Sequence, residues 1–351
     1  MSAKQTAVVI CPGRGTYNSS ELGYLGRVSS KNAKLVSFVN ELDSLRNKAE
    51  QVPLSELDDA SRFSARIHGS GENASALIYA CALADFKSID TKQFDIVAIT
   101  GNSMGWYLAL ACAGVLPGNA GFEVVNSMGL LMHDQGFGGQ VIYPLVDAQW
   151  KTDAKLVETL NRVVADVKTR KDCEVYTSIN LGGMRVLAGN DAGVAALLKE
   201  LPCEQQRYPF QLLQHSGFHS PLLSHIPAMA QDNLPEQMFR DIQIPLIDGR
   251  GKIWQPHAYD SAALYNYTLD QQICDTYDFS SAIEVAIKEY APDKIIILGP
   301  GTTLGPPVAQ ALIQHGWLGL QSKDEFLSLQ KNEPFVLGMG IESQRATVVL
   351  T

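Results

Sequence analysis

The stretch ITGNSMGWY, residues 99–107, decides the fold of this chain, because it joins a strand-like run to a helix-like run through a Gly-x-Ser-x-Gly turn. Apolar residues 94–99 precede the turn, and the helix-like residues 106–114 follow it. Such a turn lifts the hydroxyl of Ser103 clear of the backbone, and glycines on either side avoid collisions between the strand and the helix. Free N–H groups at the start of the helix face the position where an oxyanion would form. The pattern alone fits either a nucleophile elbow or a plain tight turn of an α/β protein.

Further apolar, strand-like runs that end in glycine-rich turns indicate a parallel sheet buried on both faces. These runs are residues 7–11, 244–247 and 294–298. Continuous apolar runs of this length are typical of buried parallel strands. The first run leads into PGRG at 12–15, whose glycines lack the spacing of a nucleotide-binding fingerprint.

A segment with a different rhythm interrupts this pattern. Its order of elements is strand, helix, strand, strand, helix, strand, which is typical of a ferredoxin-like unit. The strands are expected at 140–146, 174–180, 184–188 and 205–210, and the helices at 153–167 and 192–201. We therefore predict an α/β large domain formed by residues 1–138 and 206–351, with a small domain of residues 139–205 inserted into it.

Composition narrows the classes of function. The chain has 351 residues, 46% of them apolar, which is enough for a large core and about two domains. A net charge of −9 argues against a nucleic-acid partner. No early segment has the pattern of a targeting sequence, and no apolar run approaches the ~18 residues of a membrane span. Without such segments we expect a cytoplasmic protein that has no membrane partner. The six cysteines show no C-x-x-C spacing, so we expect reduced thiols and no metal site.

Four ordered motifs resemble those of the acyl-CoA:acyl-carrier-protein transacylases, the family of malonyl-CoA:ACP transacylase and of polyketide synthase acyltransferase domains. CPGRG at 11–15 is similar to the family's Phe-Pro-Gly-Gln-Gly, and GNSMG at 101–105 is similar to its Gly-His-Ser-x-Gly. FHSPL at 218–222 matches the family's Phe-His-Ser-Pro-Leu, and GPG at 299–301 matches its late Gly-Pro-Gly. The order and spacing agree over essentially the whole chain. The resemblance implies an α/β-hydrolase-like large domain with an inserted ferredoxin-like small domain.

The same resemblance implies a Ser-His acyltransferase. Ser103 would attack the acyl thioester while His219 takes its proton. The backbone N–H groups of Met104 and Arg14 would form the oxyanion hole. The substrate would be acyl-CoA and the partner an acyl carrier protein that supplies a phosphopantetheine thiol, with no cofactor bound to this chain. A monomer is the simplest expectation.

Members of the family orient the histidine through a backbone carbonyl. The matching strand end lies at Asp248 and Gly249, so the resemblance assigns the carbonyl that holds His219 to this pair. Because a carbonyl survives any substitution, Gly249 in place of the usual amide residue leaves this role intact. His215 and His225 are expected to be structural or solvent-facing.

The departures from the family pattern concern the substrate. Malonyl-specific members carry an arginine that binds the free carboxylate of the substrate, and Met128 stands at that position here. A carboxylate buried without a cation costs several kcal/mol, so the pocket should favour an uncharged acyl group such as acetyl or a longer chain. Two alternatives stay open. Met128 could merely pack a helix, and Arg14, at the family's glutamine position, could bind a carboxylate from another direction.

Three further residues are assigned to the substrate site by the resemblance. Asn102 replaces the family's histidine, and Trp106 replaces its usual glutamate. Trp106 either reshapes the entrance or simply packs. Phe218 is typical of members whose substrates are unbranched at the α-carbon.

Three functions fit these observations. The first is a transacylase that moves an acyl group from coenzyme A to a carrier protein. The second is an acyl-carrier-protein hydrolase, in which water resolves the acyl-serine. The third, disfavoured by the presence of both Ser103 and His219, is a docking protein without catalysis.

Overall fold

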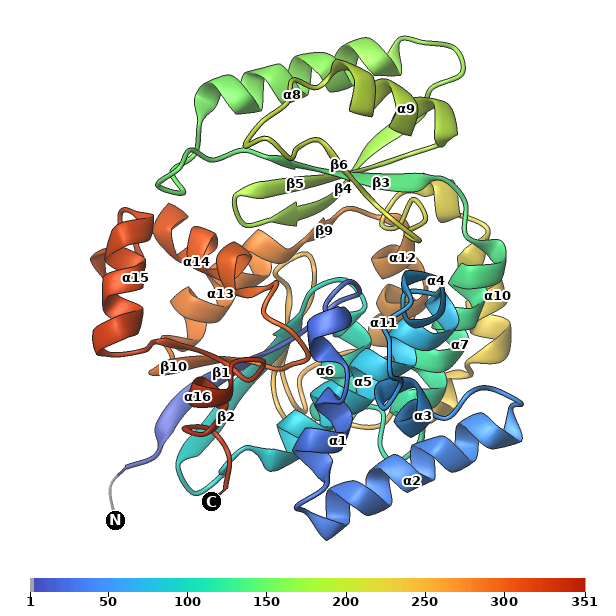
Figure 1. Cartoon of the computed structure of the whole chain (residues 1–351), viewed down its shortest axis with the longest axis vertical. Helices are drawn as coiled ribbons and strands as arrows, with labels where there is room; N and C mark the ends of the chain where they lie inside the picture. The colour runs from blue at the N-terminus through green and yellow to red at the C-terminus, as the bar shows by residue number, and fades with distance from the viewer. Residues whose placement is uncertain (1–2, 351) are drawn as a thin grey trace.

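The computed structural model describes residues 3–350 and consists of a large α/β domain with a small domain above it (Figure 1). Within these residues the central sheet has the strand order β11-β10-β1-β2-β7-β8 and is parallel except for the last pair. Its strands are β1 (Gln5–Cys11), β2 (Phe94–Gly101), β7 (Leu246–Ile247), β8 (Ile253–Trp254), β10 (Lys294–Ile297) and β11 (Val336–Gly338).

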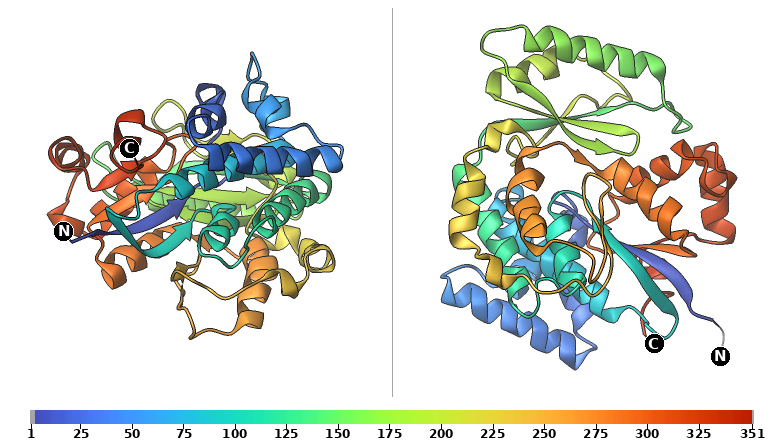
Figure 2. Two further views of the ribbon diagram at one scale, coloured as in Figure 1. Left: turned by 90° about the horizontal axis from the view of Figure 1, so that it is seen from below. Right: turned by 180° about the vertical axis from the view of Figure 1, so that it is seen from behind.

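Helices cover both faces of this sheet (Figure 2). Val8 packs with Ala282 of α13 (Phe279–Tyr290), whereas the next residue, Val9, belongs to the main core on the opposite face. Successive strand side chains point to opposite faces, so a strand covered on both must be apolar throughout. This explains the continuous apolar run at 7–11.

The main core is enclosed by helices that come from both halves of the large domain. The longest, α5 (Gly71–Ser88), is almost wholly buried and packs against α6 (Gly105–Cys112) and α7 (Ala120–Gln135). The other helices of this domain are α1 (Tyr24–Ser29), α2 (Ala33–Lys48), α3 (Leu54–Asp58), α4 (Ala65–His68), α10 (Ile226–Asn233), α11 (Ser261–Asn266), α12 (Gln272–Cys274), α14 (Gly305–Gln314), α15 (Lys323–Asn332) and α16 (Glu342–Arg345).

The small domain has the predicted ferredoxin-like order. Its strands β3 (Gly139–Pro144), β4 (Val175–Leu181), β5 (Met184–Gly189) and β6 (Phe210–Leu212) form an antiparallel sheet in the order β6-β3-β5-β4. Helices α8 (Ala154–Lys168) and α9 (Asp191–Glu200) pack on its outer face. The large domain contributes β9 (Tyr277–Asp278), which pairs with β4 in parallel and joins the two domains in one sheet. The predicted fold class is confirmed.

The predicted boundary at residue 205 is too early. Gln205 and Gln206 have φ angles of 51° and 56° and form a left-handed turn in place of extended strand. The last strand therefore starts at Phe210, and the chain leaves the small sheet only after Leu212. No helix within residues 3–350 is long and apolar enough to cross a membrane.

Candidate active site

Ser103 lies on a sharp turn between β2 and α6 and has a φ of 56°, an unfavourable value for a side chain other than glycine. The neighbouring glycines leave no room for a side chain. A Cβ at Gly101 would lie 2.2 Å from the carbonyl oxygen of Gly105, and one at Gly105 would lie 2.3 Å from that of Cys11. The local structure is thus a nucleophile elbow, in which the strain at the serine is maintained by the packing around it.

The hydroxyl of Ser103 lies 2.7 Å from Nε2 of His219. The other ring nitrogen of His219, Nδ1, lies 2.6 Å from the backbone carbonyl oxygen of Gln272. Because a carbonyl oxygen only accepts, Nδ1 must carry the ring proton, and Nε2 is left to accept the proton of Ser103. His219 is 4% exposed, so its ring is largely shielded from bulk water.

The assignment of the orienting carbonyl to Asp248 and Gly249 is wrong, because Gln272 supplies it. The side chain of Tyr277 explains the difference. A Cβ on Gly249 would lie 2.4 Å from the Tyr277 ring, and the same ring lies 5.2 Å from that of His219. Tyr277 therefore packs between the strand end and the imidazole. The carboxylate of Asp248 instead binds Arg250.

Gln272 also contacts the elbow through its side chain. Its Nε2 donates to the carbonyl oxygen of Ser103 at 3.0 Å, and its Oε1 accepts from the hydroxyl of Tyr107 at 2.9 Å. The residue follows a π-helical turn, η4 (Tyr267–Gln271), a form of helix often found at functional sites. One residue therefore holds both members of the Ser-His pair, and no motif in the sequence points to it.

Two backbone amides are free to face an oxyanion. The N–H groups of Met104 and Arg14 have no hydrogen-bond partner in the part of the chain that the structure describes. Met104 follows the serine at the start of α6, where the helix dipole is positive. The loop that carries Arg14 runs close to the elbow, because a Cβ on Gly13 would lie 2.5 Å from the carbonyl oxygen of Asn102.

Burial controls the charge of the histidine. Desolvation lowers the pKa of His219 from 6.5 to about 4, and its hydrogen bond to Gln272 opposes this shift only in part. The imidazole is therefore neutral at neutral pH. A neutral ring can act as the base toward Ser103.

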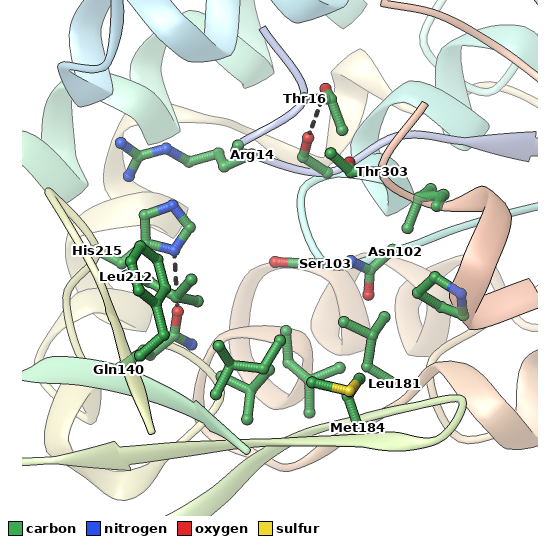
Figure 3. A pocket seen from close by; sticks show the side chains of 18 of the residues that line it. Arg14, Thr16, Asn102, Ser103, Gln140, Leu181, Met184, Leu212, His215 and Thr303 are labelled. Carbon is green, nitrogen blue, oxygen red and sulfur yellow. Dashed lines mark hydrogen bonds between the residues drawn. The ribbon is translucent and has the colours of Figure 1, made fainter. Parts of the chain in front are cut away.

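Two cavities meet at Ser103. The larger, here called the cleft, has a volume of about 830 Å³ and lies between the two domains (Figure 3). The smaller, here called the chamber, has a volume of about 50 Å³ and extends behind the serine among α5, α6, α7 and α12. Arg14, Ser103 and Phe218 line both cavities, so they stand at the opening between them.

Met128, which the resemblance assigns to the substrate site, lies in the chamber. It is 3% exposed, and its neighbours there include Met132, Val125, Tyr107 and Ile273. The lining is mostly apolar, and its one cationic side chain within residues 3–350 is Arg14.

The guanidinium of Arg14 is a partly buried cation that pairs with no carboxylate within residues 3–350. Its Nη2 donates to the carbonyl oxygens of Gly69 at 2.9 Å and Gln214 at 3.1 Å, and its Cζ lies 5.7 Å from the centre of the Phe218 ring. Its Nε has no hydrogen-bond partner within residues 3–350. Burial lowers the pKa of Arg14 to about 10, so the group remains charged at neutral pH.

Of the other residues predicted for the substrate site, Asn102 lines the cleft and Phe218 lines both cavities. The prediction that places Trp106 in this site is wrong. Trp106 is fully buried and lines neither cavity. Its Nε1 donates to Thr268 at 3.0 Å, and its ring packs edge-on against Tyr267 at 5.4 Å. The helix turns this side chain away from the serine and toward the core, which supports the packing alternative.

No protein-family model matches this chain, and no curated protein matches it. Solved structures do. The malonyl-CoA:acyl carrier protein transacylase of Xanthomonas oryzae is 19% identical, with a TM-score of 0.73 over 99% of this chain and 98% of that one. The malonyl CoA-acyl carrier protein transacylase of Coxiella burnetii is 15% identical, with a TM-score of 0.74 over 98% and 96%. A third match, 17% identical with a TM-score of 0.74 over 99% of both chains, is a malonyl-transacylase in complex with its type II polyketide acyl-carrier protein. The chain therefore has the fold of the malonyl-CoA:ACP transacylases over 98% to 99% of its length.

Proposed function

We propose that this chain is an acyltransferase that moves an uncharged acyl group from acyl-CoA, through an acyl-Ser103, to the phosphopantetheine thiol of an acyl carrier protein. The observation that carries the proposal is the contact between Ser103 and His219 on a nucleophile elbow. The shared fold of solved transacylases supports it.

The first half-reaction loads the enzyme. His219 Nε2 takes the proton of Ser103 while Oγ attacks the thioester carbonyl carbon, and the amides of Met104 and Arg14 stabilise the oxyanion. The carbon–sulfur bond then breaks, and the coenzyme A thiolate leaves with the proton from His219. The carbonyl of Gln272 stabilises the imidazolium that exists between these two transfers.

The second half-reaction reverses the roles. The thiol of the carrier protein gives its proton to His219 and attacks the acyl-serine carbonyl. The bond to Oγ breaks, and Ser103 recovers its proton from His219. Two substrates that react in turn with one serine predict ping-pong kinetics.

The volume and the lining of the chamber support the proposal that the acyl group is short and carries no carboxylate. A water needs roughly 10–15 Å³ of such volume, so about 50 Å³ holds only a few heavy atoms. Met128 offers a carboxylate no partner there, and a buried carboxylate without a cation costs several kcal/mol. Of the chamber's one cation within residues 3–350, Arg14, Nη2 is already engaged with two carbonyl oxygens, so carboxylate binding by Arg14, the alternative to this proposal, would fall to Nη1.

Intact-mass measurements test the proposal. The protein is incubated with acetyl-, butyryl- or malonyl-CoA, with and without holo carrier protein. We expect an acetyl adduct that persists alone and passes to the carrier. Rapid loss of the adduct as free acid would indicate the hydrolase instead, and no adduct would indicate a docking protein. Malonyl loading as fast as acetyl loading would contradict the uncharged substrate. We also propose a cytoplasmic location, where acyl-CoA and carrier proteins would meet.

A further inference from the structure

His215 lies at one end of the cleft, opposite the elbow, and the proposed mechanism does not use it (Figure 3). Its ring packs edge-on against Phe218 at 5.9 Å, and the guanidinium of Arg14 lies 5.7 Å from the same ring. Arg14 and His215 therefore flank one aromatic side chain at the same end of the cleft.

A chain of hydrogen bonds fixes which nitrogen of His215 carries the proton. The carbonyl oxygen of Phe218 can only accept, so the hydroxyl of Ser178 donates to it at 2.8 Å. Ser178 Oγ must then accept from Nε2 of Gln140 at 2.6 Å, which turns Oε1 of Gln140 toward His215 at 3.0 Å. Because Oε1 can only accept, the ring proton of His215 is on Nδ1.

The side chains that form this series of hydrogen bonds, Gln140 and Ser178, belong to strands β3 and β4 of the small domain. Gln140 is 1% exposed and Ser178 is fully buried, so both depend on the partners within this chain of hydrogen bonds. Ser178 lies at an irregularity in the pairing of β4 with β5, between Thr177 and Ile179. Such a bulge can turn a side chain toward the other face of its strand.

The remaining nitrogen of His215, Nε2, is left with an unused lone pair. Among residues 3–350 it has no hydrogen-bond partner. Burial, together with the charge of Arg14, lowers the pKa of His215 to about 3, so the ring stays neutral. The Nη1 of Arg14 also has no hydrogen-bond partner within residues 3–350 and is not fully buried, whereas Nε is unpaired but buried. This end of the cleft thus presents one unused acceptor and one unused donor.

We infer that Nε2 of His215, as acceptor, and the guanidinium of Arg14, as donor, bind the amide groups of the substrate's pantetheine arm. An anion would need donors on both sides and would be repelled by a lone pair that does not take up a proton. A neutral amide supplies both the N–H and the carbonyl oxygen that the pair can use. The inference rests on the proposed function, because it assumes a pantetheine thioester in the cleft.

Small thioesters test the inference separately from the proposed function. An acetyl thioester of N-acetylcysteamine keeps one amide of the arm, whereas the acetyl thioester of butanethiol has none. We expect the wild-type protein to load from the amide-bearing thioester with a kcat/KM roughly three- to tenfold higher, the usual effect of one neutral hydrogen bond. His215→Phe keeps a ring against Phe218 and should lose most of this preference. His225→Phe, an exposed histidine bonded to Gln135, should keep it.

An unchanged preference in His215→Phe would overturn the inference while leaving acyl transfer intact. Failure of every thioester, acetyl-CoA included, to acylate Ser103 would instead overturn the proposed function. A second measurement needs no variant. In ¹⁵N-histidine-labelled wild-type protein at neutral pH, NMR should find the His215 proton on Nδ1, and a proton on Nε2 would contradict the assigned acceptor.

Discussion

The chamber and the cleft meet at Ser103, and each has its own histidine four residues apart in one loop. Both rings are neutral, and both hold their proton on Nδ1, His219 by a backbone carbonyl and His215 by a side-chain amide. They differ in the partner of Nε2, which is the hydroxyl of Ser103 in one case, whereas in the other Nε2 has no hydrogen-bond partner within residues 3–350. The comparison teaches that the same tautomer becomes a base or a ligand acceptor according to the group opposite it.

The largest effect should come from Ser103→Ala, which removes the group that distinguishes the two histidines. Without Oγ neither ring faces a nucleophile, so we expect no covalent adduct with any acyl-CoA. Intact mass after incubation with acetyl-CoA measures this directly. An adduct that persists in the variant would place the nucleophile elsewhere. The thermal unfolding midpoint of the variant checks that the elbow still folds.

Next in size is the difference between His219→Ala and His215→Ala. Loss of a general base lowers a rate by about 10²- to 10⁴-fold, whereas loss of a neutral hydrogen bond lowers it by roughly tenfold or less. We therefore expect the acylation rate to collapse in the first variant and to fall modestly in the second. Rapid-quench loading by acetyl-CoA gives both rates. Equal losses would remove the distinction between base and ligand acceptor.

Met128→Arg tests how the lining of the chamber selects the acyl group. A cation at this position would pair with a carboxylate that otherwise enters the chamber alone, an effect of several kcal/mol. We expect the ratio of malonyl to acetyl loading to rise by about tenfold to several hundredfold, since each ~1.4 kcal/mol is a factor of ten. Met229→Arg, at an exposed methionine of α10, is the matched control and should leave the ratio unchanged. A constant ratio in Met128→Arg would show that the acyl group does not reach this wall.

The sequence predicts those parts of the site whose chemistry depends on local geometry. Ser103 could be predicted because its turn requires glycines at two fixed positions. His219 could be predicted because it lies in a second motif at the expected distance downstream. The role of Gln272 could not be predicted from the sequence. Its main role is performed by a backbone carbonyl, which any residue possesses, and folding brings it to His219 from 53 residues away.

The predictions for Trp106 and for the end of the small domain are wrong for a related reason, because in both the local sequence pattern does not decide the outcome. Trp106 lies only three residues from the serine, but the direction of its side chain is set by helix geometry and by Thr268, far along the chain. The residues before Phe210 look like a strand, but left-handed backbone angles at Gln205 and Gln206 make them a turn. In both cases tertiary packing overrides a local pattern.

A smaller effect is expected from Gln272→Leu, which leaves the backbone carbonyl in place and removes only the side-chain bonds to Ser103 and Tyr107. One lost hydrogen bond to the elbow should lower kcat roughly three- to tenfold with little change in KM. Gln271→Leu is the neighbouring control, because its side chain contacts Arg250 and not the elbow. Steady-state transfer from acetyl-CoA measures both parameters. A change confined to KM would mean that Gln272 acts on the substrate and not on the pair.

The smallest effect is the dependence of loading on pH, and it tests the burial of the chamber's histidine. Because desolvation lowers the pKa of His219 to about 4, the acylation rate should stay level from neutral pH to about 5 and fall to half near pH 4. The same shift acts on stability. In the unfolded chain the imidazole takes up a proton near pH 6.5, whereas in the folded chain it does so only near pH 4. The contribution of neutral His219 to the free energy of unfolding is therefore complete above pH 6.5 and is lost as the pH falls through 4. Rapid-quench rates and unfolding midpoints at each pH separate the two effects. A half-maximal rate near pH 6.5 in folded protein would mean that bulk water reaches His219, and the contrast between a shielded chamber and an open cleft would then be lost.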